Sequence, residues 1–312
     1  MQNVNCIHIM QKTEVELKWF WSSLYTHPMY IRFKEYFIYI FKDVLNSGKY
    51  EKIIIYSVFS DDKGPNQEER RSNKKILHVL YSGEPPPKAP HLRDPNLFDL
   101  NLIPSLEAKL DNSVIIPHTL GGQHLYIHDL WNLLYYQRDS EKDNTLKDKF
   151  CAFIVSNGAP IERKYFFQYV NTEYKKVDSC GPFANNTGFL PPEIDTEEYY
   201  NFLSKYKFMI CFENTKGNYY FTEKLINAYI GKCIPIYWGC IELPEFINEK
   251  ALIYIENAND DSFKKALERI IELDNDPIKY REVYEQPLFK MGELPPELNV
   301  FYIRNKINSY LL

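Results

Sequence analysis

Short apolar runs alternate along the chain with segments in which apolar residues recur every three or four positions. The runs predict buried strands, and the periodic segments predict amphipathic helices. In the first half, we expect a helix over residues 29–45, ending at Asn46-Ser47-Gly48. Strands are expected over residues 15–19, 53–56, 76–81 and 113–116.

The second half of the chain repeats this alternation more regularly. Strands are expected over residues 150–155, 208–212, 234–238 and 252–255. Helices are expected over residues 162–170, 221–230, 261–273 and 299–312. A helix of about a dozen residues between two β-rich runs is typical of a parallel βαβ unit, so the pattern predicts an α/β fold. Ligands of such folds gather outside the carboxyl ends of the strands.

Two domains are expected in a chain of 312 residues, because roughly 150 residues are enough for one domain. Residues 139–149 are densely charged and lose the apolar period, which marks the boundary. We therefore predict an α/β domain over residues 1–145 and a Rossmann-like domain over residues 146–312. The last helix either completes the second domain or packs back on the first.

Composition excludes several classes of function. The net charge is −5, and basic pairs such as Arg70-Arg71 lie beside Glu68-Glu69, so nucleic-acid binding is not expected. The six cysteines show no C-x-x-C spacing, which indicates reduced, structural thiols. No window approaches 18 uncharged apolar residues, and the first residues do not resemble a secretion signal. A soluble, cytoplasmic protein without a transmembrane segment is therefore expected.

The candidate chemistry is concentrated in residues 208–239. A strand ends at Glu213-Asn214, a glycine-bearing turn follows, and Thr222-Glu223-Lys224 opens a helix. A helix start presents free backbone N–H groups and the positive end of the helix dipole, which suits a phosphate or diphosphate. Thr222 is the expected N-cap, and Lys224 is expected to contact the anion directly.

Arg163 is a second candidate cation, because its helix follows the strand that ends near Ser156-Asn157. Each charge-assisted contact of this kind contributes about 1.5–3 kcal/mol. Taken alone, each candidate has a plainer explanation. These explanations are capping electrostatics for Glu223-Lys224, a turn for Asn214, a surface position for Arg163 and a solvated loop for Glu84. Only their combination in one ordered pattern favours a nucleotide site.

That combined pattern resembles the α-1,3-fucosyltransferases of glycosyltransferase family 10. Residues 212–214, 220–224 and 234–239 are similar to the family's F-E-N, Y-V-T-E-K and I-P-I-Y-W-G blocks. Weaker similarity is found in Ser156-Asn157 with Ala159-Pro160-Ile161 and Arg163, in Tyr81-Ser82-Gly83-Glu84, and in Asn96-Leu97-Phe98-Asp99. The resemblance covers about residues 76–255.

The resemblance implies a GT-B type fold, in which two Rossmann-like domains face each other across a cleft. It implies that the C-terminal domain binds the donor GDP-fucose and the N-terminal domain binds an oligosaccharide or glycoconjugate acceptor. Lys224 and Arg163 are implied to contact the diphosphate. The other implied donor-site residues are Ser156 and Asn157, which line the pocket, and Asn214, Tyr220 and Glu223, which contact the ribose or the fucose.

The resemblance further implies that Glu84 is the catalytic base and that Glu223 lies near the positive charge developing on the fucose ring. The implied reaction is an inverting displacement at the anomeric carbon of GDP-β-L-fucose, giving an α-L-fucoside at O3 of GlcNAc or glucose. Such a transfer needs one base and cations that stabilise the leaving GDP. Asp274-Asn275-Asp276, in a late polar turn, is better explained as a loop cap than as a metal site. No obligatory metal is expected, and weak stimulation by divalent ions stays compatible with this expectation.

Three functions stay open at this point. The first is α-1,3-fucosyl transfer by a bacterial or viral type of enzyme, since the anchor and stem of animal members are not seen. The second keeps the fold and the GDP pocket but forms an α-1,4 linkage or uses another GDP-deoxyhexose. The third is a catalytically silent glycan- or nucleotide-binding protein. Departures from the family pattern are Phe221 and Asn218-Tyr219 at the Y-V-T-E-K block, and Pro85-Pro86-Pro87 after Glu84.

Overall fold

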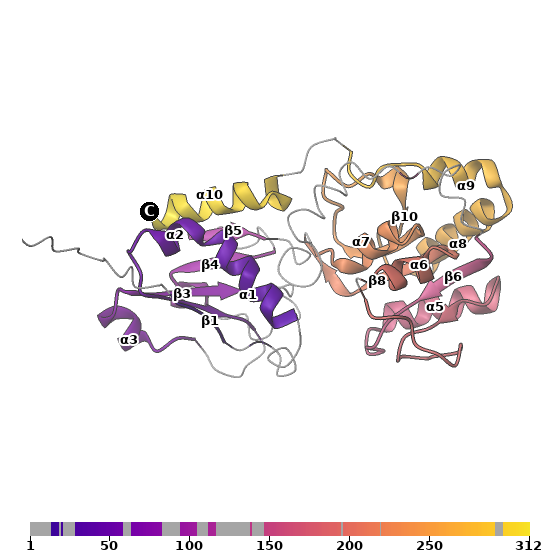
Figure 1. Cartoon of the computed structure of the whole chain (residues 1–312). Helices are drawn as coiled ribbons and strands as arrows, with labels where there is room; N and C mark the ends of the chain where they lie inside the picture. The colour runs from indigo at the N-terminus through magenta and orange to yellow at the C-terminus, as the bar shows by residue number, and fades with distance from the viewer. Residues whose placement is uncertain are drawn as a thin grey trace, which may run out of the picture.

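The computed structural model describes residues 14–18, 20, 29–58, 64–82, 94–104, 112–116, 138, 147–194, 196–218, 220–290 and 296–312. Within these residues the strands form two five-stranded sheets, one in each half of the chain (Figure 1). Neighbouring strands within each sheet run parallel. The predicted α/β class is confirmed.

The first sheet follows the order of the chain. Its strands are β1 (Glu14–Lys18), β2 (Lys52–Tyr56), β3 (Ile76–Tyr81), β4 (Leu100–Ile103) and β5 (Ser113–Ile115). The pattern analysis missed β4, whose sequence Leu-Asn-Leu-Ile is short and carries a buried polar residue, Asn101. On β2, Ile53 and Ile55 face one core while Ile54 and Tyr56 face another, because successive strand residues point to opposite sides of a sheet.

Four helices of the described chain accompany this sheet. They are α1 (Met29–Ile40), α2 (Lys42–Asn46), α3 (Gln67–Ser72) and α10 (Val300–Leu311). The single helix expected over residues 29–45 is wrong in one respect: it breaks at Phe41, whose φ and ψ are −97° and 9°. Phe37, Phe41 and Val44 stay together in one core across this break. Burying one such apolar side chain contributes about 1.5–3 kcal/mol.

The last helix lies against the first sheet's helices. α10 contacts α1, α2 and β5, and Figure 1 shows it alongside them. Asp43 of α2 accepts hydrogen bonds from Arg304 and Asn308, and Lys49 donates to the carbonyl of Leu311. The predicted boundary at residues 145 and 146 falls outside the described residues and stays a prediction.

The second sheet has the spatial order β10-β9-β8-β6-β7. Its strands are β6 (Lys149–Phe153), β7 (Asp178–Ser179), β8 (Tyr206–Gly217), β9 (Ile234–Cys240) and β10 (Ile253–Tyr254). Its helices are α5 (Ile161–Glu173), α6 (Glu197–Leu203), α7 (Glu223–Ile230), α8 (Asp260–Asn275) and α9 (Pro277–Tyr284). Short 3-10 helices span Pro95–Leu97, Glu249–Ala251 and Pro296–Leu298. The pattern analysis missed β7, α6 and α9.

The strand order decides where a ligand can bind. In the second sheet, β7 lies on one side of β6 and β8 on the other, so the direction of winding reverses between β6 and β8. Such a switch point opens a crevice at the carboxyl ends of its two strands. The first sheet runs from β1 to β5 without a reversal. The topology therefore places the candidate nucleotide site at the ends of β6 and β8.

Arg138 anchors the opposite end of α7. Its guanidinium donates to the carbonyls of Ala228, Tyr229 and Cys233, at the end of the helix and just beyond it. The guanidinium carbon also lies 3.9 Å from the centre of the Tyr229 ring. A cation at a helix C-terminus complements the helix dipole. Arg138 therefore stabilises the helix whose first turn carries Glu223 and Lys224.

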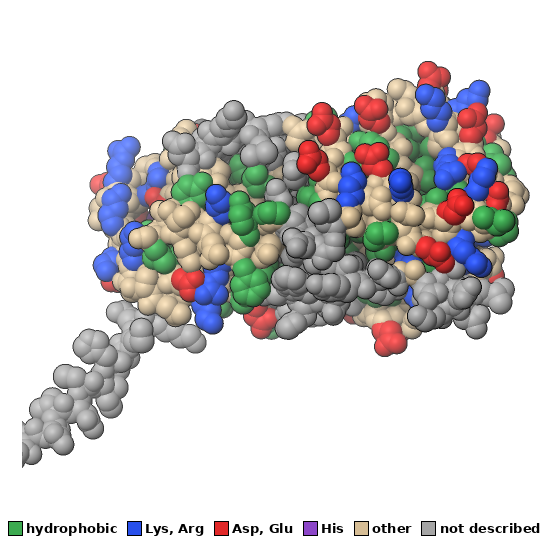
Figure 2. Space-filling model, turned by 90° about the horizontal axis from the view of Figure 1, so that it is seen from above, with side chains coloured by type: hydrophobic (Ala, Val, Ile, Leu, Met, Phe, Trp, Pro, Cys, Tyr) green, Lys and Arg blue, Asp and Glu red, His purple; other side chains and the backbone are tan. Residues whose placement is uncertain are grey.

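On the face of the molecule that Figure 2 shows, the described residues carry charges of both signs. Figure 2 shows Lys and Arg side chains interspersed with Asp and Glu side chains over the half that carries α8 and α9. Glu272, for example, pairs with both Arg269 and Lys279. In the part of the chain that the structure describes, no helix is long and apolar enough to cross a membrane.

Candidate active site

Glu213 is the centre of the candidate site. It follows the apolar run of β8, and its side chain is fully buried. Its Oε1 accepts from the Thr222 N–H at 2.8 Å, and its Oε2 accepts from the Thr222 hydroxyl at 2.8 Å. Lys224 Nζ lies 3.2 Å from Oε2. One buried carboxylate thus holds both the cap and the cation of α7.

The three predicted sequence blocks meet at this carboxylate. Phe212, beside Glu213, packs on Trp238 of β9 with ring centres 5.6 Å apart. Gly239 follows Trp238 and faces the Glu213 side chain so closely that a Cβ there would lie 2.3 Å from Glu213 Cγ. Tyr237 donates from its hydroxyl to the Tyr220 carbonyl at 2.9 Å. The blocks are therefore linked by packing and hydrogen bonds as well as by order in the chain.

Lys224 has three acceptors in this structure. Its Nζ lies 3.2 Å from Glu213 Oε2, 3.0 Å from Thr222 Oγ1 and 3.1 Å from Glu223 Oε1. Burial acts to lower the pKa of Lys224, but the carboxylates of Glu213 and Glu223 outweigh it and raise that pKa. Burial also raises the pKa of the Glu213 carboxyl, and the Lys224 ammonium counteracts that rise. Lys224 is therefore a fixed ammonium group at neutral pH.

Arg163 bridges the two strand ends at the switch point. Its Nη1 donates to the Asn157 carbonyl at 3.1 Å, after β6, and its Nη2 donates to the Phe212 carbonyl at 2.8 Å, on β8. Nη2 also donates to Asn214 Oδ1 at 2.7 Å. The residue is only 1% exposed, and its Nε has no hydrogen-bond partner. The surface alternative for Arg163 is therefore wrong, because the guanidinium lies inside and joins the ends of β6 and β8.

The remaining predicted donor-site residues lie around this core. Ser156 and Asn157 are exposed in the loop after β6, where Asn157 Oδ1 accepts from the Ala159 N–H. Asn214 is half-buried beside Arg163. Tyr220 is buried, and Glu223 keeps 17% of its side chain exposed. The fold thus brings four of these residues together near the carboxyl ends of the strands of the second sheet. They are Arg163, Asn214, Glu223 and Lys224.

The start of α7 differs in one respect from the expectation. Thr222 is the N-cap, as predicted, since its hydroxyl accepts from the Lys224 N–H. However, the Thr222 N–H already donates to Glu213. The expectation of free N–H groups is therefore wrong for Thr222 and Lys224, whose amides have acceptors inside the protein. At this helix start, the group expected to contact an anion is therefore the Lys224 ammonium group, and not these two backbone amides.

Glu84, the expected base, lies outside the described residues. The structure follows its segment as far as Ser82, just beyond the carboxyl end of β3. In the neighbouring block at residues 96–99, Asp99 stabilises the fold. Asp99 accepts from Arg70 Nε and from the His78 N–H, which ties α3 to β3 and β4.

Sequence reasoning missed Glu213 as a site residue. The signal that could have revealed it is a carboxylate placed directly after the apolar run of a buried strand, since an acidic residue there needs partners. The partner lies eleven residues further along, after a turn, and only the folded chain shows that Lys224 returns to Glu213.

No cluster of metal-binding side chains is found among the described residues. The loop-cap interpretation of residues 274–276 holds for Asp276, which caps α9 by accepting from the Ile278 and Lys279 N–H groups. Asp274 instead lies near the end of α8 and pairs with Lys175 and Lys207. The five described cysteines are free and buried, as expected for reduced structural thiols. Whether the reaction needs a metal stays a prediction.

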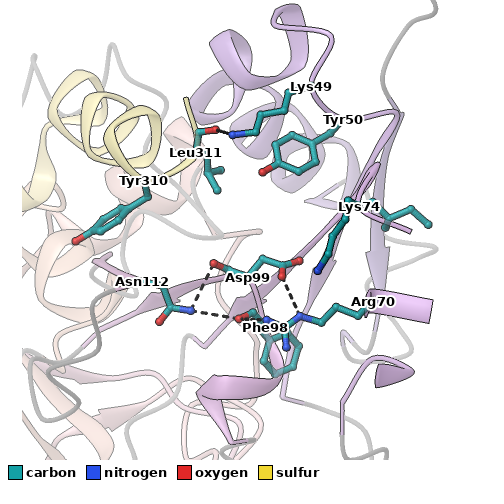
Figure 3. Close-up of a pocket in the computed structure, with 10 residues that line it drawn as sticks. Lys49, Tyr50, Arg70, Lys74, Phe98, Asp99, Asn112, Tyr310 and Leu311 are labelled. Carbon is teal, nitrogen blue, oxygen red and sulfur yellow. Dashed lines mark hydrogen bonds and ion pairs between the residues drawn. The ribbon is translucent and has the colours of Figure 1, made fainter. Parts of the chain in front are cut away.

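A pocket of about 410 Å³ lies in the first half of the chain, at one end of the strands of the first sheet (Figure 3). Apart from Ile76 of β3 and Tyr310 and Leu311 of α10, its lining residues precede β2, β3, β4 and β5, so it sits at the amino ends of these strands. Its polar groups largely serve the fold: Arg70 pairs with Asp99, Lys49 donates to the Leu311 carbonyl, and Asn112 donates to the Phe98 carbonyl. This pocket is therefore separate from the candidate site.

Comparison with known proteins finds similarity in the same part of the chain that carries the candidate site. Residues 144–286 match the profile of glycosyltransferase family 10 (fucosyltransferase), C-terminal part. An alpha-(1,3)-fucosyltransferase of Helicobacter pylori is 34% identical over 151 residues, which cover 48% of this chain and 30% of that protein. A putative fucosyltransferase of Acanthamoeba polyphaga mimivirus is 33% identical over 150 residues, covering 46% and 24%. GDP-fucose protein O-fucosyltransferase 3 of Danio rerio is 30% identical over 118 residues, covering 35% and 26%. The matches thus span less than a third of each of these relatives.

Solved structures extend the likeness to the whole fold. A crystal structure of an α1,3-fucosyltransferase with GDP-fucose matches with a TM-score of 0.67 at 19% identity, covering 96% of this chain and 90% of that chain. A second crystal structure of an α1,3-fucosyltransferase matches with a TM-score of 0.69 at 20% identity, covering 96% of this chain and 89% of that chain. The chain therefore has the two-domain GT-B fold of these structures, and residues 144–286 are similar to the C-terminal part of glycosyltransferase family 10, the fucosyltransferases.

Proposed function

We propose that this protein is an inverting α-1,3-fucosyltransferase. It moves L-fucose from GDP-β-L-fucose to O3 of a GlcNAc or glucose unit in a glycan, and it releases GDP. The observation that carries the proposal is the ammonium group of Lys224, held by the buried Glu213 at the switch point where Arg163 binds Asn214, in the region that matches family 10.

The two cations have different parts in this proposal. Lys224 keeps 17% of its side chain exposed and can contact the diphosphate directly. Arg163 already donates to two backbone carbonyls and to Asn214, so it mainly orients these groups and supplies positive charge. Together they balance the negative charge that develops on GDP as the bond to fucose breaks.

The acceptor hydroxyl loses a proton, and GDP leaves from the sugar. The acceptor oxygen forms a bond to the anomeric carbon, and the bond from that carbon to the β-phosphate oxygen breaks with its electron pair leaving on GDP. Glu84 takes the proton of the acceptor hydroxyl and later passes it to solvent. Glu223, in the first turn of α7, faces the positive charge on the sugar ring. Neither step involves a metal.

The test is a GDP-release assay with GDP-fucose, EDTA and a panel of lactose, N-acetyllactosamine and chitobiose. We expect turnover with one of these acceptors, and a loss of roughly a hundredfold or more in kcat/KM for Lys224→Ala. Glu84→Ala should abolish turnover while GDP still binds. Lys279→Ala, which removes an exposed lysine of α9, is the control and should behave as wild type. NMR of the product then distinguishes O3 from O4 linkage and the α from the β anomer.

A second acceptor class is favoured by one observation. Several relatives are named GDP-fucose protein O-fucosyltransferase 3, including that of Homo sapiens at 24% identity over 179 residues. The alternative is therefore transfer of fucose to a serine or threonine hydroxyl of a protein. Adding folded and unfolded protein acceptors to the panel separates the two classes. If GDP-fucose neither binds nor turns over while another GDP-sugar does, the donor assignment is wrong.

A further inference from the structure

The three acceptors of Lys224 are not equivalent. An ammonium group has three N–H donors, and all three have an acceptor in this structure. A diphosphate oxygen can therefore join Lys224 only if one of these acceptors leaves. We propose that Glu213 and Thr222 are permanent positioning residues for Lys224, and that Glu223 is the partner which the diphosphate displaces. This inference rests on the proposed function, because it assumes that the donor's diphosphate binds Lys224.

Glu213 cannot leave its place. Its side chain is fully buried, and both carboxylate oxygens are held by Thr222 at 2.8 Å. On the side of β9, Gly239 lies so close that there is no room for even a methyl group. A substrate cannot reach this carboxylate, so Glu213 acts only through Lys224. Thr222 is equally confined, with 1% exposure and a hydroxyl bound to Glu213.

Glu223 is placed differently. It is the first residue of α7, and its side chain is 17% exposed. Its contact with Lys224 joins neighbouring residues, so a change of side-chain rotamer can break it without moving the backbone. The negative diphosphate and the Glu223 carboxylate compete for the same ammonium proton. A displaced Glu223 carboxylate can turn toward the sugar that the diphosphate carries.

The charges around Lys224 indicate that the diphosphate replaces the Glu223 contact and does not simply add to the existing contacts. Burial acts to lower the pKa of Lys224, Glu213 and Glu223 outweigh burial and raise it, and Arg163, from α5, acts to lower it. Two carboxylates beside one lysine and one buried arginine leave no net positive charge to attract an anion. Replacing the Glu223 contact by the diphosphate removes one negative group from Lys224 as another arrives. The donor then meets an ammonium group that Glu213 still holds in place.

The experiment measures binding of GDP and of guanosine by calorimetry. Guanosine lacks the diphosphate, so a variant that only damages the fold weakens both ligands, whereas loss of Lys224 positioning weakens GDP alone. We expect Glu213→Gln to weaken GDP about tenfold or more and to change guanosine less than about twofold. Glu223→Gln should bind GDP roughly two- to tenfold more tightly, because the diphosphate displaces a neutral amide instead of a carboxylate. With GDP-fucose, Glu223→Gln should lower kcat without raising KM.

Thr222→Ala and Thr222→Ser provide the matched pair, also in case Glu213→Gln fails to fold. The alanine variant lacks one permanent acceptor and should weaken GDP selectively, and the serine variant should restore it. The inference is overturned if Glu223→Gln weakens GDP as strongly as Glu213→Gln, or if GDP and guanosine weaken equally. It is also overturned if neither Glu213→Gln nor Thr222→Ala changes GDP binding. If the wild-type protein does not bind GDP, the proposed function itself fails.

Discussion

Gly239 lies directly against Glu213, on the neighbouring strand of the second sheet. A Cβ on residue 239 would stand 2.3 Å from Glu213 Cγ and 2.6 Å from Glu213 Cβ. The φ of Gly239 is also positive, at 153°. Two separate constraints therefore require glycine here: the backbone conformation, and the space taken by the carboxylate that holds Lys224.

Gly239→Ala should destabilise the protein by about 2–4 kcal/mol, from the backbone strain and the overpacking together. Urea denaturation measures this change in the free energy of unfolding. The matched control is Gly188→Ala, since Gly188 also has a positive φ of 77° but nothing within 4 Å of a Cβ. The control should cost about 1 kcal/mol. Equal costs at the two positions would contradict the close contact with Glu213.

Arg163→Lys should destabilise the protein by about 2–4 kcal/mol, because one ammonium cannot satisfy the groups that the guanidinium joins. These groups are the carbonyls of Asn157 and Phe212 and the side chain of Asn214. The same substitution at Arg269, an exposed residue of α8, should change stability by less than about 0.5 kcal/mol. Denaturation with and without GDP compares the two variants. A nearly neutral Arg163→Lys would show that the bridge between β6 and β8 is dispensable.

Asp274 should make the protein's stability fall in acid. Burial alone would raise the pKa of this carboxyl, but hydrogen bonds from Lys175, Lys207 and Tyr174 lower it below its usual 3.8. Because the folded pKa is the lower one, the stabilisation is present above pH 3.8 and is lost as the pH falls through the folded pKa.

Asp274→Asn removes this titration. Its unfolding free energy should lie below that of the wild type at neutral pH, and the difference should shrink as the pH is lowered from 4 to 2. Denaturation curves across this pH range provide the measurement. A difference that is constant with pH would mean that the lysines and Tyr174 do not stabilise the charged form.

Arg138→Gln should lower the melting temperature, because the carbonyls at the end of α7 lose a buried cationic donor. We expect a cost of about 2–3 kcal/mol, measured by calorimetry. Since α7 also carries Lys224 at its other end, bound GDP should recover part of the loss. Arg281→Gln, on the exposed face of α9, serves as the control and should melt as the wild type does.

The predictable part of this fold follows from local patterns. The run Lys-Ile-Ile-Ile-Tyr at β2 and the run Ile-Pro-Ile-Tyr-Trp-Gly-Cys at β9 read as strands because they are too apolar to be anything but buried. Thr222 was readable as an N-cap because a threonine before Glu-Lys at a helix start satisfies free amides whatever lies around it. In contrast, α6 and α9 show weak periodicity, and the break at Phe41 has no sequence signal.

The sequence by itself determined the alternation of strands and helices, the family resemblance of three blocks and the choice of Lys224 as a cation. These depend on neighbours along the chain, which a sequence displays directly. Tertiary structure alone decided that Glu213 holds Lys224, that Arg163 is buried between two strand ends, and that Gly239 leaves room for a carboxylate. Each is a contact between segments brought together by strand order, and strand order is set by the packing of the whole sheet rather than by any local pattern.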